Sequence, residues 1–130
     1  MKILIVDDEL VSRKKLAKIL SCKGLLDECE NGHQAIETFE KACLEGNPYR
    51  LVTLDINMPG LSGLQLLPML RSIEQKYLKG MDIPAVMVMV TAETELESIK
   101  KAIKHSCSDY LVKPFEKDFV LARYEEWMAD

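Results

Sequence analysis

The chain has 130 residues and a mass of 14.8 kDa, a size that predicts a single domain spanning residues 1–130. Apolar residues make up 48% and charged residues 29% of the chain, a composition that excludes a disordered protein. The net charge of −4 at pH 7 argues against a nucleic-acid partner, because nucleic-acid-binding surfaces carry an excess of basic residues.

Short apolar runs alternate with longer amphipathic stretches along the chain. The runs are typical of buried strands at residues 3–6, 51–54, 85–90 and 110–112, with a weaker candidate at 25–29 that contains two acids. Between them, apolar side chains recur at helical spacing, in stripes formed by Leu16, Ile19 and Leu20; Ala35, Ile36 and Phe39; Leu96, Ile99, Ala102 and Ile103; and Phe115, Phe119, Ala122 and Trp127. Pro68 lies inside one further expected helix and removes its hydrogen bond to the Leu64 carbonyl, so we expect a kink or a late helix start there.

The alternation of strand and helix occurs five times and predicts an α/β fold with a doubly wound, five-stranded parallel sheet. Unbroken apolar strands suit a sheet that is covered on both faces. Right-handed crossovers place helices on both sides, which gives a three-layer sandwich. In such folds, ligands bind at the carboxyl ends of the strands, near the point where the strand order reverses.

No segment of the sequence indicates a membrane or an oxidising compartment. The longest apolar run, residues 83–90, contains Pro84 and is far shorter than the ~20 residues that cross a bilayer. The sequence shows no signal peptide before the first apolar run. The four cysteines form no CxxC pair, and neither His33 nor His105 completes a zinc spacing. We therefore expect reduced thiols and a cytoplasmic protein without membrane contact.

Charged and hydroxyl side chains follow the expected strands. Asp7 and Asp8 follow the first strand, Asp55 the third, Thr91 the fourth and Lys113 the fifth. Each has an ordinary alternative role, since acids and threonine cap helices, aspartate opens turns and lysine is often simply solvated. Because the carboxyl ends of parallel strands meet at one edge, we expect the whole set to form a single site.

The chemistry of this set favours a divalent cation and phosphoryl transfer. Three carboxylates at one point repel one another, and Mg²⁺ relieves this repulsion while it keeps several waters and bridges to phosphate oxygens. A carboxylate is also a competent nucleophile toward phosphorus, and phosphoryl transfer needs mainly positioning and charge neutralisation. The sequence contains no GxxxxGK[ST] and no GxGxxG loop, so we expect it to bind no nucleotide of its own.

Five motifs, in this order, resemble the receiver domain of two-component response regulators over residues 2–128. They are ILIVDDE at 3–9, NGHQA at 31–35, LDINMPGLSG at 54–63, VTA at 90–92 and DYLVKPF at 109–115. The resemblance implies the flavodoxin-like fold of five β–α units and one receiver domain with no output domain. The stretch from Asp55 to Thr91 is a few residues longer than usual in the family, and we expect the excess within residues 74–83.

The resemblance also implies an acceptor and a metal site. Asp55 corresponds to the phospho-accepting aspartate. Asp8 and Asp55 correspond to the direct Mg²⁺ ligands, with the backbone carbonyl of Asn57 as a third ligand. Asp7 corresponds to the acid that reaches the metal through water.

Three further residues correspond to groups that respond to the phosphoryl group. Thr91 matches the hydroxyl that moves to bond a phosphoryl oxygen, and Lys113 matches the lysine that pairs with the phosphoryl group. The bond from Lys113 to Pro114 is expected to be cis. Tyr110 matches the switch aromatic that turns inward on activation.

The function implied by the resemblance is that of a phosphorylation-activated signalling switch. A sensor histidine kinase or a histidine phosphotransfer protein would donate the phosphoryl group, in a two-component system or a phosphorelay. The chain would not be an enzyme beyond its own phosphorylation and dephosphorylation. Its output would pass by onward phosphotransfer or to a downstream protein bound at the face formed by the fourth helix, the fifth strand and the fifth helix.

Three alternatives remain open at this point. An aspartate-nucleophile phosphohydrolase would use a D-x-D pattern with a hydroxyl residue two positions later, which neither residues 7–9 nor residues 55–59 provide. A flavodoxin-like cofactor-binding protein would need a hydroxyl- and glycine-rich phosphate loop after the first strand, where this chain has three acids. A degenerate receiver that carries no phosphate would be expected to lack some of the site residues, all of which are present.

Overall fold

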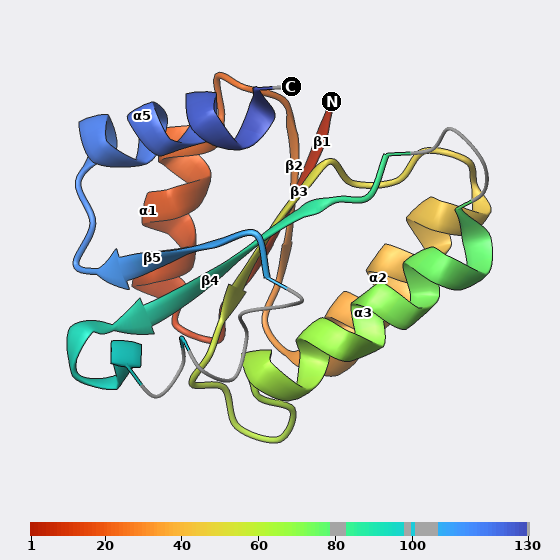
Figure 1. The fold of residues 1–130 in the computed structure, drawn as a ribbon, viewed down its shortest axis with the longest axis horizontal. Coiled ribbons are helices and arrows are strands. Elements are labelled where there is room, and N and C mark those ends of the chain that lie inside the picture. The colour runs from red at the N-terminus through yellow and green to blue at the C-terminus, as the bar shows by residue number, and fades with distance from the viewer. Residues whose placement is uncertain (79–82, 98–99, 101–106, 130) are drawn as a thin grey trace.

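The computed structural model describes residues 1–78, 83–97, 100 and 107–129, which form one sheet with helices on both faces (Figure 1). The elements are β1 (Lys2–Val6), α1 (Leu10–Leu20), β2 (Leu25–Cys29), α2 (Gly32–Leu44), β3 (Leu51–Asp55), α3 (Gly63–Tyr77), β4 (Val86–Ala92), the 3₁₀ turn η1 (Glu93–Glu95), β5 (Asp109–Lys113) and α5 (Lys117–Met128). All five predicted strands are confirmed, including the weaker β2. Most of the expected fourth helical stripe, at Ile99, Ala102 and Ile103, lies outside the described residues.

The five strands are parallel and follow the spatial order β2-β1-β3-β4-β5. The order reverses between β1 and β3, so the predicted doubly wound sheet is confirmed. Val6 pairs with Leu54 and Asp55 with Val90, which brings the carboxyl ends of β1, β3 and β4 to the same edge. This edge is the one at which ligands bind in such folds.

Helices α1 and α5 cover one face of the sheet, and α2 and α3 cover the other (Figure 1). Alternate side chains of β1 divide between the two layers. Ile3 and Ile5 pack with α1 and α5, whereas Leu4 and Val6 pack with α2 and α3. The edge strand β2 is largely exposed, which explains how it accommodates Asp27 and Glu28. No helix of the described residues combines the length and the apolar character needed to cross a membrane.

Several element boundaries differ from those expected. Asp55, Thr91 and Lys113 lie within the ends of β3, β4 and β5 rather than after them, because their backbones still pair with the neighbouring strand: Asp55 with Val90, Thr91 with Val112, and Ala92 with Lys113. Strand ends are therefore set by backbone pairing here, and not by the end of an apolar run.

Helix α3 begins before Pro68, so a late start at this proline is wrong. Ser62 caps the helix, because its hydroxyl accepts the Gln65 N–H at 3.2 Å and the Gln65 side chain accepts the Ser62 N–H at 3.0 Å. This reciprocal cap fixes the start five residues upstream of the proline, and the helix continues to Tyr77. The excess length expected within residues 74–83 falls partly on 79–82, which lie outside the described residues.

Candidate metal and phosphorylation site

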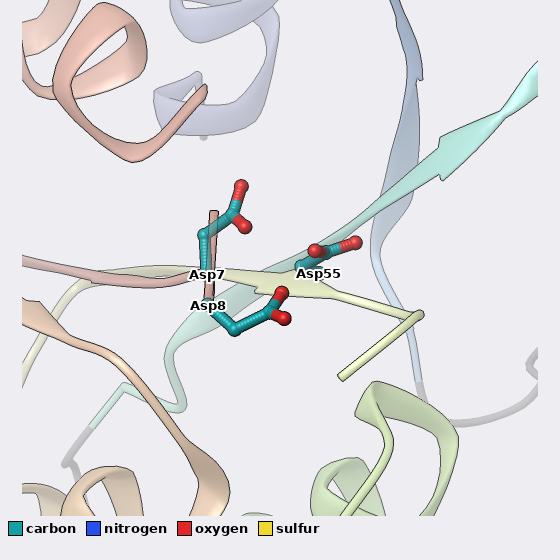
Figure 2. A group of neighbouring side chains, drawn as sticks. All are labelled: Asp7, Asp8 and Asp55. Atoms are coloured by element: carbon teal, nitrogen blue, oxygen red, sulfur yellow. The ribbon is translucent and has the colours of Figure 1, made fainter. Parts of the chain in front are cut away.

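Three carboxylates gather at the carboxyl edge of the sheet (Figure 2). Asp7 and Asp8 follow β1, and Asp55 is the last residue of β3. One ligand oxygen of each acid lies within 4.8 Å of the others. Asp7 and Asp55 are each only 5% exposed, whereas Asp8 is exposed. The structure thus brings the three predicted acids together, with one side of the cluster open to solvent.

Lys113, at the end of β5, reaches the two buried acids. Its Nζ lies 3.3 Å from Asp7 Oδ2 and 3.5 Å from Asp55 Oδ2. Burial opposes the charged ammonium, but the charges of Asp55 and Asp7 outweigh it and raise the pKa of Lys113. Among the described residues, Lys113 is the one cation that pairs with these acids, so negative charge remains in excess in the cluster.

The excess charge is reflected in the titration of Asp55. Burial raises the pKa of Asp55 to about 7, and the hydrogen bond and charge of Asp7 act in the same direction. The charge of Lys113 and the Asn57 N–H, which donates to Asp55 Oδ1 at 3.3 Å, act against this rise. A carboxyl group with a raised pKa in an acid cluster is typical of a site that functions with a bound cation or a reacting group.

The two acids after β1 differ in how their oxygens are bonded. Asp7 Oδ1 accepts the Glu9 N–H at 2.8 Å, and Asp7 Oδ2 accepts a hydrogen bond from Lys113 at 3.3 Å. The carboxylate of Asp8 has no hydrogen-bond or ion-pair partner within the part of the chain that the structure describes. Both oxygens of Asp7 are therefore engaged, whereas those of Asp8 are available to a ligand.

The donor set fits Mg²⁺. This cation takes oxygen ligands, binds through one or two carboxylates and keeps several waters. The cluster offers carboxylate oxygens from two strand ends, an open side at Asp8 for water, and a surplus of negative charge that a dication relieves. Receiver domains bind Mg²⁺ in acidic pockets of this kind.

Within the described residues, neither Thr91 nor Tyr110 forms a hydrogen bond with the acid cluster. Thr91 is 1% exposed, and its hydroxyl donates to the Ala92 carbonyl at 3.1 Å. Tyr110 is half-buried and packs against the core between the sheet and helices α2 and α3. The Lys100 Nζ lies 5.4 Å from the centroid of the Tyr110 ring.

The Lys113–Pro114 peptide bond is cis, as expected from the sequence.

Three residues outside the predicted set also shape the site. A Cβ at Gly63 would lie 2.5 Å from the Asp55 carbonyl oxygen, so only glycine lets α3 begin this close to β3. Glu95 of η1 accepts a 2.7 Å hydrogen bond from the Asn57 side chain and links the loops after β3 and β4. Arg13 of α1 is buried and donates to the Asp7 carbonyl at 2.9 Å. A sequence signal for Gly63 exists, because it is the last residue of the LDINMPGLSG motif. No sequence pattern distinguishes Arg13 or Glu95 from solvated residues.

Comparisons with known proteins agree with the geometry. The family model of the response regulator receiver domain matches residues 3–125. The chemotaxis protein CheY of Bacillus subtilis is 36% identical over 122 residues, which cover 92% of this chain and 91% of that protein. The CheY of Listeria monocytogenes is 30% identical over 128 residues, 97% of each chain.

Solved structures show the same fold. Vibrio cholerae CheY4 gives a TM-score of 0.78 at 25% identity, over 98% of both chains. The CheX–CheY–BeF₃–Mg²⁺ complex from Borrelia burgdorferi gives a TM-score of 0.82 at 23% identity, over 100% of this chain and 90% of that one, and this likeness concerns the fold alone. The family model that matches is thus neither that of a phosphohydrolase nor that of a cofactor-binding flavodoxin, the two other protein classes considered from the sequence. The chain therefore belongs to the response regulator receiver domain family, the phosphorylation-activated switches of two-component systems.

Proposed function

We propose that Asp55 is the residue that accepts the phosphoryl group. The observation that carries this assignment is the position of Asp55 between opposite charges. Its Oδ2 lies 3.5 Å from the Lys113 ammonium, while oxygens of Asp7 and Asp8 lie within 4.8 Å. A cation held by the acids and the ammonium of Lys113 would together neutralise the oxygens of a phosphoryl group on Asp55, which is the main requirement of phosphoryl transfer.

The proposed step converts the Asp55 carboxylate into an acyl phosphate. A carboxylate oxygen of Asp55 attacks the phosphorus of a phosphohistidine; a phosphorus–oxygen bond forms, the phosphorus–nitrogen bond breaks, and the imidazole leaves with its electron pair and takes a proton from water. Asp55 must be ionised to attack, and its pKa of about 7 leaves much of it protonated at neutral pH. Bound Mg²⁺ supplies the positive charge that favours the ionised form and offsets the charge of the phosphoryl oxygens.

For the metal, we propose Asp8 and Asp55 as the direct ligands, with the backbone carbonyl of Asn57 as a third, and Asp7 bound through water. The free carboxylate of Asp8 on the exposed side of the cluster supports a direct role. The occupied oxygens of Asp7, bonded to the Glu9 N–H and to Lys113, support an indirect one.

For the output, we propose that a downstream protein binds beside β5 and α5. A groove of about 470 Å³ lies there, and the exposed ring of Phe119 lines it together with Tyr110. Tyr110 is thereby shared between the groove and the core, so a change in its rotamer would alter the groove. Residues 98–99 and 101–106, which belong to the fourth helix of the expected face, lie outside the described residues.

For the pathway, we propose that the protein is cytoplasmic and that a sensor histidine kinase or a histidine phosphotransfer protein is the phosphoryl donor. The protein then acts as a switch or a phosphorelay intermediate and turns over only its own phosphoryl group. The resemblance to CheY proteins over nearly their whole length supports a receiver that signals through a partner protein.

Phosphorylation by a small donor tests the acceptor. The protein is incubated with acetyl phosphate and Mg²⁺, and intact-mass measurement should show the addition of one phosphoryl group. Asp55→Asn should abolish this addition, and a chelator should prevent it in the wild type. Glu9→Ala serves as the control for Asp8→Ala, because Glu9 neighbours the cluster but is absent from it; only the Asp8 variant should lose Mg²⁺ affinity strongly. Labelling of the Asp55→Asn variant to the wild-type extent would contradict the assignment.

A further inference from the structure

Arg13 is a buried arginine on α1 that lies against the backbone of the site rather than against its carboxylates. It is 7% exposed. Its Nε lies 3.1 Å from Glu28 Oε1 on β2, and its Nη1 donates to the carbonyl oxygen of Asp7 at 2.9 Å. A guanidinium presents donors in a fixed planar arrangement, so one partner sets its orientation toward the other. Glu28 therefore orients Arg13, and Arg13 holds the Asp7 carbonyl.

The backbone of Asp7 is bonded on both sides of the residue. Its N–H donates to the Cys29 carbonyl of β2 at 3.1 Å, and its carbonyl accepts from Arg13. The peptide group that joins Asp7 to Asp8 is consequently fixed in orientation. Asp8 itself has no side-chain partner within the described residues. The position of its carboxylate relative to Asp55 thus depends on the peptide that Arg13 holds.

We propose that Arg13 is a positioning residue for the metal site. Arg13 holds the turn after β1, so that the Asp8 carboxylate faces Asp55 at the separation that one cation requires. The inference rests on the proposed function, in which Asp8 and Asp55 bind Mg²⁺ directly. Groups that orient the ligands of a metal without touching it typically change metal affinity about 10–100-fold when they are removed. Arg13 acts in this way through a backbone carbonyl.

Two simpler roles for Arg13 make different predictions. If Arg13 acted only through its charge, its removal from the neighbourhood of three acids would strengthen the binding of a dication. If it only fastened α1 to β2, its removal would lower the free energy of unfolding and leave the Mg²⁺ affinity of the folded protein unchanged. Of these three roles for Arg13, only the positioning role predicts that a folded variant binds Mg²⁺ more weakly.

The test measures Mg²⁺ affinity by calorimetry on the unphosphorylated protein, and measures the free energy of unfolding separately in chelator. Arg13→Met keeps the length of the side chain but removes every donor, and should weaken Mg²⁺ binding about tenfold or more. Arg13→Lys should recover part of this loss, because one ammonium can reach the Asp7 carbonyl or Glu28 but lacks the planar arrangement that joins both. Lys14→Met is the matched control: Lys14 also pairs with Glu28, at 3.0 Å, but is exposed, and its loss should leave Mg²⁺ affinity within about twofold.

Unchanged or tighter Mg²⁺ binding in Arg13→Met, or an equal loss in Lys14→Met, would overturn the proposal. If Arg13→Met does not fold, Arg13→Lys decides the question, since wild-type affinity in that variant would show that the two-partner geometry is not needed. Asp8→Ala separates this inference from the proposed function. If Asp8→Ala binds Mg²⁺ as tightly as the wild type, the assignment of the ligands fails, whatever the Arg13 variants show.

Discussion

Replacement of Asp55 by asparagine is expected to stabilise the metal-free protein at neutral pH. The pKa of Asp55 is about 7 in the folded protein, against 3.8 for an ordinary aspartate. The folded state therefore holds this proton more tightly than the unfolded state, and stability falls as the pH rises from about 4 to about 7. Above pH 7, the folded state bears the whole cost of the ionised carboxylate, which is about 4 kcal/mol at 1.36 kcal/mol per pKa unit.

The net gain from Asp55→Asn is close to this cost, because asparagine resembles the neutral, protonated carboxyl group. The pKa of about 7 already includes the favourable charge of Lys113, 3.5 Å away, so the loss of this ion pair is not a further cost. The asparagine oxygen still accepts the Asn57 N–H, and Lys113 keeps its contact with Asp7 at 3.3 Å. A net stabilisation of about 3–4 kcal/mol is expected, or about 10–16 °C in Tm for a chain of this length.

Thermal unfolding followed by circular dichroism in chelator, at pH values from 5 to 8, measures this effect. The difference in Tm between Asp55→Asn and the wild type should grow from pH 5 to pH 7 and then level off. Asp118→Asn removes the same charge from an exposed position on α5 and should show no such rise. Mg²⁺ should reduce this difference in Tm, because it binds the folded wild type more tightly than the folded variant. A Tm difference that is absent, negative or independent of pH would refute the electrostatic argument.

Three further substitutions test other parts of the structure. Gly63→Ala should destabilise the protein by about 1–3 kcal/mol in urea unfolding and slow phosphorylation, because the new Cβ meets the Asp55 carbonyl at 2.5 Å. Glu74→Ala should destabilise by about 2–4 kcal/mol in the same assay, because the buried carboxylate accepts the Ala85 N–H at 2.6 Å and pairs with an arginine. Thr91→Ala should leave phosphorylation by acetyl phosphate largely intact but confine the resulting chemical-shift changes in NMR spectra to the surroundings of the acid cluster.

The sequence predicted those features that follow from local pattern and sheet topology. Apolar runs located all five strands, and parallel pairing then required Asp7, Asp55 and Lys113 to meet at one edge. The late helix start at Pro68 was wrong because a local cap formed by Ser62 and Gln65 outweighs the hydrogen bond that the proline removes. In these cases the deciding interactions lie within a few residues or follow from strand order.

Features that depend on packing between distant segments could not be predicted. Arg13 and Glu74 are polar residues on amphipathic helices, where a sequence pattern indicates solvation, yet each is buried against the backbone of a different segment. The hydrogen bond from the Asn57 side chain to Glu95 joins the loops after β3 and β4, which are adjacent only because these two strands pair. Sequence alone also gives no rotamer, so the orientation of the Thr91 hydroxyl toward Ala92 was not foreseen.

This orientation sets a limit on how phosphorylation can switch the protein. In the unphosphorylated state, the Thr91 hydroxyl already donates to the Ala92 carbonyl, so a phosphoryl oxygen gains only the difference between two hydrogen bonds. A hydrogen bond to a charged acceptor contributes about 1.5–3 kcal/mol against about 1 kcal/mol for a neutral one, a difference of about 0.5–2 kcal/mol. Reversal of a 1:99 equilibrium requires about 5.5 kcal/mol of differential affinity.

Thr91 alone therefore cannot drive the switch, and the remainder must come from groups whose contacts also change with the phosphoryl group. Lys113 is the strongest candidate among the described residues, because it now divides its charge between Asp7 and Asp55 at 3.3 and 3.5 Å. A phosphoryl group on Asp55 would draw the ammonium toward it, and β5, which carries both Lys113 and Tyr110, would transmit that change to the groove beside α5. The switch then depends on the combined difference in affinity of several contacts, which is the only quantity by which a ligand shifts a conformational equilibrium.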